Sequence, residues 1–252
     1  MARSAEGTGG GRTLHSQAAA RIGQRILSGE WATGDTLPTE ADLARELTVS
    51  RASLREAIKL LAGKGLIRST PRRGTVVQPR ANWNRLDPDV LVWQAFDGPT
   101  ASFVRDLFEL RRMIEPAVAA LAAGRASDEH RKAIGEAFRA MENAPDVQAS
   151  IVADLAFHRA ILLATGNELL AAFAPAIEAS LSVSFKVSRA NMMTQDHVVP
   201  MHRAVAEPVL AGDVEGAHQA MMALLDRSER DAATAVTLTQ GGRSAGTEGG
   251  TG

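Results

Sequence analysis

Apolar residues recur at helical spacing in three short segments near the beginning of the chain. The first covers residues 14–28, the second 39–47 and the third 50–62. Thr39 and Ser50 stand at the starts of the last two, and both residue types favour helix N-caps. Three helices are therefore predicted, the last two separated by a tight turn.

The pattern changes after residue 65. Residues 66–70 and 75–78 are short extended runs on either side of Pro71–Gly74, which predicts a two-stranded hairpin with a basic tip. Beyond residue 79 the spacing is helical again, and the predicted fold is mainly α. We expect six or seven helices there, with breaks near residues 98–99, 127–128, 144–145, 166–167, 194–197 and 212–213.

Charge is distributed unevenly. Residues 1–80 contain 13 Lys and Arg against 7 Asp and Glu, a net charge of +6, and the remainder carries −7. A basic head on an acidic body favours a polyanion as the partner of the head. There is no cysteine, so any metal must be held by His, Asp or Glu. No apolar run reaches the roughly 20 residues that cross a bilayer, and a soluble, cytoplasmic protein is expected.

Three helices followed by a hairpin is the order of a winged helix-turn-helix, in which the helix after the tight turn enters the major groove of DNA. Arg51 in that helix can give two hydrogen bonds to a guanine edge, while neighbouring hydroxyls and Arg55 can bind phosphates. From charge alone, a merely solvated basic face is the safer interpretation. The predicted DNA-contacting residues are Ser50, Arg51, Ser53, Arg55, Arg72, Arg73 and Gly74.

The same segments resemble the DNA-binding head of the GntR family of transcription regulators. The resemblance is carried by Leu37–Ala44, Val49–Ala57, Leu66–Ile67 and Arg73–Val77, and it covers about residues 14–79. It implies that the partner is a double-stranded DNA operator. If one head reads a half-site, a homodimer reads a palindrome, so a homodimer is expected.

Two later stretches, residues 109–123 and 154–167, resemble the FCD ligand-binding domain of the FadR-type branch of that family. The resemblance implies an all-helical bundle that holds a divalent metal and a small carboxylate. Both chain ends have too few apolar residues to offset the entropy of ordering. The predicted organisation is a disordered tail at 1–11, a winged helix-turn-helix DNA-binding domain at 12–79, a linker and first sensor helix at 80–98, a helical ligand-sensing domain at 99–238 and a disordered tail at 239–252.

The spacing of Asp154 and His158 is an independent reason to expect a metal. Residues four apart on a helix face the same side, and His202 on a later helix can complete the set. These oxygen and nitrogen ligands suit zinc, manganese or nickel. A buried Asp–His hydrogen bond without metal is the alternative that the spacing leaves open.

One position departs from the family pattern. The family usually supplies a further histidine in the last helix, where this chain has Leu224. His218 cannot replace it, because six residues at about 100° each place it roughly 120° away around the helix. Either three protein ligands hold the metal and water or an effector completes its coordination, or the site binds an effector by hydrogen bonds without metal.

Cations near this site are candidate ligands for an anionic effector. Arg111 lies in an apolar helix, where it either pairs with Glu115 or binds a carboxylate. Lys186 and Arg189 follow another apolar stretch and are further candidates.

The effector class is suggested by the segment 78–93, which resembles the linker and first sensor helix of galactonate-catabolism repressors in the family. A sugar acid such as galactonate or gluconate is therefore expected to relieve repression. Another small carboxylate, such as lactate, is an alternative. A metal-dependent enzyme with an accessory DNA-binding head is less favoured, since no general base lies near the three ligands in sequence. The chain is expected not to be an enzyme.

Overall fold

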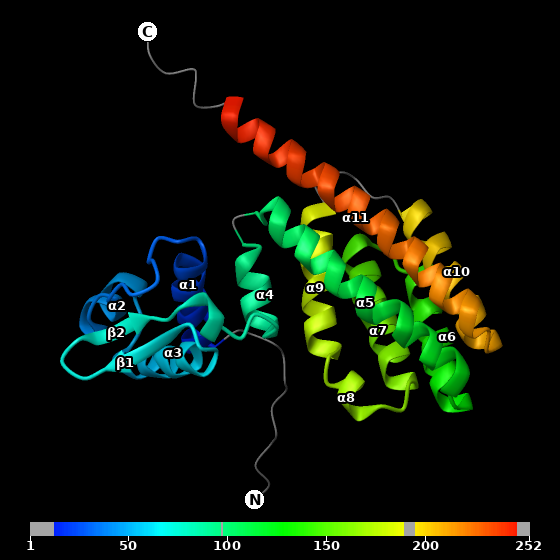
Figure 1. The fold of residues 1–252 in the computed structure, drawn as a ribbon, viewed down its shortest axis with the longest axis horizontal. Helices are drawn as coiled ribbons and strands as arrows, with labels where there is room; N and C mark the ends of the chain where they lie inside the picture. Colours follow the sequence, from blue (N-terminus) through cyan, green and yellow to red (C-terminus); the bar gives the residue numbers. More distant parts are fainter. Residues whose placement is uncertain (1–12, 97, 189–194, 246–252) are drawn as a thin grey trace, which may run out of the picture. The chain divides into compact units, whose positions relative to one another are not determined.

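The computed structural model describes the backbone of residues 13–96, 98–188 and 195–245, and the side chains of 13–96, 98–185 and 198–237. It divides into two compact units, residues 1–94 and 95–252 (Figure 1).

Three helices form the core of the first unit: α1 (Leu14–Leu27), α2 (Glu40–Leu47) and α3 (Arg51–Gly63). The predicted caps of α2 and α3 are confirmed. The Thr39 hydroxyl accepts a hydrogen bond from the Asp42 N–H, and the Ser50 hydroxyl accepts one from the Ser53 N–H. These bonds satisfy backbone donors that a helix start otherwise leaves free.

The predicted hairpin is also present. Strand β1 (Ile67–Thr70) pairs antiparallel with β2 (Gly74–Val77), so that Ile67 lies opposite Val77 and Thr70 opposite Gly74. Thr36 forms a further bridge to Val76 in β2, which fixes the hairpin to the segment before α2. The first unit is therefore a winged helix-turn-helix.

The segment after the hairpin packs on the first unit. It contains the short helix η1 (Arg80–Asn82) and α4 (Pro88–Gln94). Trp93 of α4 is 4% exposed and lies against Gly23 of α1, where a Cβ atom would come within 2.3 Å of the indole. Lys64 Nζ lies 2.7 Å from Asp87 Oδ1 and 2.9 Å from Asp89 Oδ2.

The sequence predicts a linker and first sensor helix at residues 80–98, whereas the structure groups residues up to 94 with the head. The physical reason is the apolar face of α4. Val90 and Trp93 are buried in the core cluster that α1 and α3 also form, and the removal of this apolar surface from water favours the packing.

The second unit is entirely helical in its described parts. Its helices are α5 (Ala101–Arg125), α6 (Asp128–Glu142), α7 (Val147–Ala164), α8 (Glu168–Ala171), α9 (Ala174–Ser188), α10 (Gln195–Ala211) and α11 (Val214–Ala245). Figure 1 shows α11 running along α5. Helix α7 contacts α5, α6 and α9.

Two stretches, Val147–Ala164 and Glu168–Phe185, are long and apolar enough to cross a membrane by length and composition alone. In the structure both supply side chains to the core of the second unit. Phe157 on α7 and Ile177 on α9 are examples. Core helices of soluble proteins have the same composition.

The structure differs from the predicted helices at two places. A break separates α8 from α9 where sequence analysis placed none. Helix α11 continues to Ala245, although a disordered tail was expected from residue 239. An existing helix can be extended without the cost of nucleation, so weak helix formers can be added to its end. The tail expected at 1–11 and the end of the chain from 246 lie outside the described residues.

Candidate functional site

Helix α3 exposes a polar start and buries an apolar back. Arg51 and Arg55 are exposed near its first turn, and Ser53 is half-buried. Leu54 and Leu61 are fully buried in the core of the first unit. This division is what a recognition helix requires, because one face must hold the helix on the domain while the other meets DNA.

The partners of these polar side chains distinguish them. Arg55 Nε donates to Glu40 Oε2 at 3.1 Å, and the Ser50 and Ser53 hydroxyls lie 2.9 Å apart. Arg51 has no hydrogen-bond or ion-pair partner among the described residues. A guanidinium with all its donors free is the best placed of the set to bind a base edge.

The two arginines at the wing tip, Arg72 and Arg73, also differ in their hydrogen-bond partners. Arg73 donates to the Gly34 carbonyl oxygen at 3.1 Å, which fixes it to the turn before α2. Arg72 is exposed and has a positive φ of 63°, and Gly74 next to it has a φ of 88°. Both arginines are exposed, and Arg72 is the one without a hydrogen-bond or ion-pair partner among the described residues.

A shallow groove of about 470 Å³ borders the start of α3. His15 of α1 and Lys59 of α3 line it beside Ser53 and Arg55. Neither residue was predicted from the sequence. His15 is brought to α3 only by the fold, whereas Lys59 lies one helical turn after Arg55 on the same helix and could have been found from that spacing.

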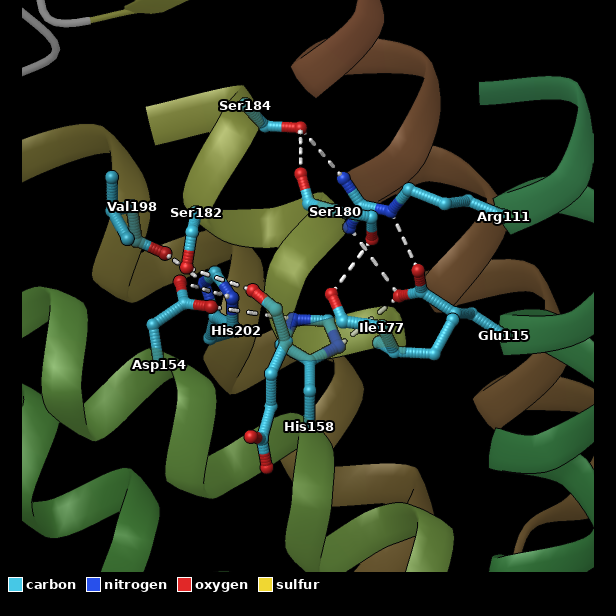
Figure 2. Close-up of polar contacts among 11 residues, drawn as sticks. Arg111, Glu115, Asp154, His158, Ile177, Ser180, Ser182, Ser184, Val198 and His202 are labelled. Carbon is cyan, nitrogen blue, oxygen red and sulfur yellow. Dashed lines mark hydrogen bonds and ion pairs between the residues drawn. The ribbon is translucent and has the colours of Figure 1, made fainter. Parts of the chain in front are cut away.

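In the second unit the structure brings the three predicted metal ligands together. Asp154 and His158 come from α7 and His202 from α10 (Figure 2). All three are buried, and one ligand atom of each lies within 4.8 Å of the others. His158 Nε2 is 3.6 Å from Asp154 Oδ1, and His202 Nε2 is 3.1 Å from Asp154 Oδ2.

The atoms that face one another lack hydrogen bonds. Asp154 Oδ1, His158 Nε2 and His202 Nε2 are all buried without an assigned hydrogen-bond partner, although His202 Nε2 lies within ion-pair distance of Asp154 Oδ2. Leaving a buried polar atom unpaired costs about 1–3 kcal/mol. Three such atoms at one point fit a cation that accepts their lone pairs.

The opposite nitrogen of each ring has a partner. His202 Nδ1 lies 2.8 Å from the carbonyl oxygen of Val198, which can only accept, so Nδ1 carries the proton. His158 Nδ1 lies 3.1 Å from Glu115 Oε2. Metal-binding histidines nearly always use their second nitrogen in this way.

The structure answers the question that sequence analysis left open for Arg111. Arg111 is 1% exposed, and its Nε donates to Glu115 Oε1 at 2.6 Å. Its Nη1 donates to the Ser184 hydroxyl of α9 at 3.2 Å. Arg111 therefore pairs with Glu115 and lies one side chain away from the ligand cluster. Lys186 and Arg189, the other candidate effector ligands, lie outside the residues whose side chains are described.

Burial and charge act in opposite directions on these groups. Burial raises the pKa of Glu115. The Arg111 guanidinium and His158 lower it by more than burial raises it, so the pKa falls to about 2. Burial also raises the pKa of Asp154, but the combined effect of its charged neighbours, His202 first, is larger and the pKa of Asp154 lies below its usual value. Burial lowers the pKa of His202, but the combined effect of Asp154 and a backbone carbonyl oxygen is larger and the pKa of His202 lies above its usual value.

Leu224 lies at the position where the family pattern has a fourth ligand. It is 2% exposed and belongs to the hydrophobic core of the second unit. Helix α11 thus contributes packing here, and among the described residues the ligands of the cluster come from α7 and α10.

A winged helix-turn-helix joined to a helical domain with a buried ligand cluster defines a metabolite-responsive, DNA-binding transcription regulator. Residues 14–77 match the family model described as bacterial regulatory proteins, gntR family, and residues 106–227 match the FCD domain. The chain belongs to the GntR family, in the FadR-type branch that carries an FCD domain.

The relatives agree with this assignment. The chain is 32% identical over 214 residues to the galactonate operon transcriptional repressor of Escherichia coli, covering 83% of this chain and 92% of the relative. It is 35% identical over 223 residues to the putative L-lactate dehydrogenase operon regulatory protein of the same organism, covering 85% and 84%. These matches are transcription regulators and not enzymes.

A solved structure supports the fold. The structure of Lar, which controls the agr system of Listeria monocytogenes, matches with a TM-score of 0.62 at 19% identity, covering 88% of this chain and 98% of that one.

Proposed function

We propose that this chain represses genes for the catabolism of a sugar acid of the galactonate or gluconate type, and that the acid releases the repressor from its operator. In this proposal a homodimer in the cytoplasm binds a palindromic operator through the α3 helices and wings. The effector and a divalent metal bind in the second unit. The observation that carries the proposal is the buried cluster of three unpaired ligand atoms next to Arg111.

Asp154, His158 and His202 are the residues that would hold the metal, with zinc, manganese or nickel as candidates. A bound divalent cation would supply a Lewis-acidic centre for an anionic oxygen ligand. Because α11 offers Leu224 instead of a histidine, coordination positions stay open to water or to the effector.

Charge favours a carboxylate as that effector. With both histidines neutral, Arg111, Glu115 and Asp154 contribute one positive and two negative charges. A divalent cation turns this net charge from −1 to +1. A buried site with one excess positive charge attracts a monocarboxylate.

The choice of a sugar acid rests on the galactonate operon repressor among the relatives. The relative named for a lactate dehydrogenase operon supports lactate as the second candidate. Both acids have a carboxylate and a neighbouring hydroxyl, and they differ in the number of further hydroxyl groups.

Calorimetric titration of the zinc-loaded protein with galactonate, gluconate and lactate tests the effector class. We expect heat from an aldonate, and none after the metal has been removed with a chelator. Heat from lactate alone would replace the sugar acid with the second candidate. No heat from any of the three would overturn the carboxylate effector.

A gel-shift assay on DNA from upstream of the protein's own gene, at a stated salt concentration, tests release. The expected result is a shifted band that the effective acid removes. An acid that binds in the calorimeter but strengthens the shifted band would show that the chain is not released by its effector.

A further inference from the structure

The ring of His158 lies between two carboxylates that contact opposite nitrogens. Asp154 approaches Nε2 from the same helix, α7, and Glu115 approaches Nδ1 from α5 (Figure 2). Asp154 is one of the three converging ligands, whereas Glu115 lies on the far side of the ring and is not among them. Glu115 is therefore placed to orient the ring and not to bind the metal.

Glu115 is itself held firmly. Its Oε1 accepts from Arg111 Nε at 2.6 Å and its Oε2 accepts from Arg111 Nη2 at 3.4 Å. The third nitrogen of the guanidinium, Nη1, donates to the Ser184 hydroxyl of α9, and this hydroxyl donates its own proton to the Ser180 carbonyl oxygen. The carboxylate thus has little freedom to turn away from His158.

We propose that Glu115 is a positioning residue for the metal site: it accepts the Nδ1 proton of His158 and so keeps Nε2 free of a proton and directed at Asp154. An ionised carboxylate can only accept hydrogen bonds, so it requires the ring nitrogen facing it to be the donor. The ring then presents its remaining lone pair to the metal. This inference rests on the metal site of the proposed function.

A simpler role for Glu115 would be to neutralise the buried Arg111. That role alone does not explain why Oε2 also lies 3.1 Å from His158 Nδ1. The two roles predict different results when the charge pair is removed but a hydrogen-bond acceptor is kept.

Two double variants separate them: Arg111→Met with Glu115→Leu, and Arg111→Met with Glu115→Gln. Both remove one positive and one negative charge, so the local net charge is unchanged and no buried ion is left unpaired. Leu and Gln are similar in size, but only Gln has an oxygen that accepts from Nδ1. Any difference in metal affinity between the two therefore reports the hydrogen bond.

Zinc affinity is measured by competition with a chromophoric chelator. We expect the Gln variant to stay within about threefold of the wild type and the Leu variant to bind about 10- to 100-fold more weakly, the usual effect of losing an outer hydrogen bond to a ligand histidine. Equal affinities for the two variants would overturn the role of Glu115 while leaving the metal site intact. A wild type that binds no zinc would overturn the metal site itself, and this inference with it.

A measurement on the wild type keeps the inference testable if the Leu variant does not fold. Protein labelled with ¹⁵N at histidine and loaded with ¹¹³Cd shows by one-bond coupling which nitrogen binds the metal. Coupling to Nε2 of His158, with a slowly exchanging proton on Nδ1, is the expected result. Coupling to Nδ1 would overturn the inference, because Glu115 would then face a nitrogen that carries no proton.

Discussion

At the scale of single residues, the absence of one side chain allows α4 to pack on the head. A Cβ atom at Gly23 would lie 2.3 Å from Cε3 and 2.6 Å from Cζ3 of Trp93, well inside van der Waals contact. The indole ring is buried and has little room to move. Even one methyl group at this position would therefore displace α4 or α1.

We predict that Gly23→Ala destabilises the first unit by about 1–3 kcal/mol, the usual cost of overpacking a core. All three tryptophans of the chain, at positions 31, 83 and 93, lie in this unit, so tryptophan fluorescence in a urea titration reports its unfolding. Gly63→Ala is the matched control, because nothing lies within 4 Å of a Cβ there. Equal midpoints for the two variants would contradict the close packing.

Arg51 has no partner in the described structure, and its guanidinium is the predicted reader of a base. Arg51→Ala should weaken operator binding about 10- to 100-fold, since a good bidentate contact contributes about 1–3 kcal/mol of base discrimination. Binding to sequences altered at one operator position should become less selective. Fluorescence anisotropy with labelled operator DNA measures both effects. Arg139→Ala, which changes an exposed residue of the second unit, should alter neither the affinity nor the selectivity. If both variants lose the same affinity, the effect of Arg51 is one of net charge and not of a base contact.

Residue-level prediction succeeded where one helix contains the whole pattern. Asp154 and His158 are four residues apart, and so are Arg111 and Glu115, so their pairing follows from helical geometry. The contact between Glu115 and His158 joins two helices. No spacing along the chain reveals such a contact, because it depends on how α5 and α7 pack.

At the scale of elements, the turn between α2 and α3 contains a strained residue. Thr48 has a positive φ of 58° at the end of α2. A β-branched residue pays a steric cost of about 1–2 kcal/mol in this region, which glycine avoids. The tight turn of the helix-turn-helix is therefore formed at some cost in stability.

Thr48→Gly should raise the free energy of unfolding of the first unit by up to about 1 kcal/mol, because the relief of strain exceeds the added entropy of the unfolded chain. The same change at the other end of α2, Thr39→Gly, should lower it by a few tenths of a kcal/mol through loss of the N-cap bond. Urea titration followed by tryptophan fluorescence measures both. A loss of stability in both variants would show that Thr48 is not strained.

Most element boundaries could be predicted because Gly, Pro and capping residues mark them. The break between α8 and α9 escaped prediction, although Pro175 at the start of α9 is a known signal for the first turn of a helix. The packing of α4 on the head escaped for a different reason. An apolar face can be read from the sequence, but the surface that covers it cannot.

At the scale of the whole molecule, metal binding should appear as stability of the second unit. A ligand that binds only the folded state stabilises it by about 2.7 kcal/mol when present at 100 times its dissociation constant. For a unit of this size we expect zinc to raise the melting temperature by about 5–10 °C. Differential scanning calorimetry, with and without a chelator, measures this shift.

Two histidine variants provide the comparison for that measurement. His202→Ala should abolish the zinc-dependent shift, because it removes one of the three converging ligands. His218→Ala, which changes an exposed residue of α11, should keep it. A shift that persists in His202→Ala would place the zinc elsewhere.

The ion pairs of Lys64 with Asp87 and Asp89 affect where this head can be joined to another domain. A hybrid regulator that carries this DNA-binding head on another sensor domain could be joined at the end of the wing, after Val77. In this chain such a join would leave Lys64 and the surface around Gly23 facing a foreign segment. A graft that carries residues up to Gln94 as one piece would keep Asp87 and Asp89 beside Lys64 and Trp93 against Gly23. This hybrid should be more stable than one joined at the wing.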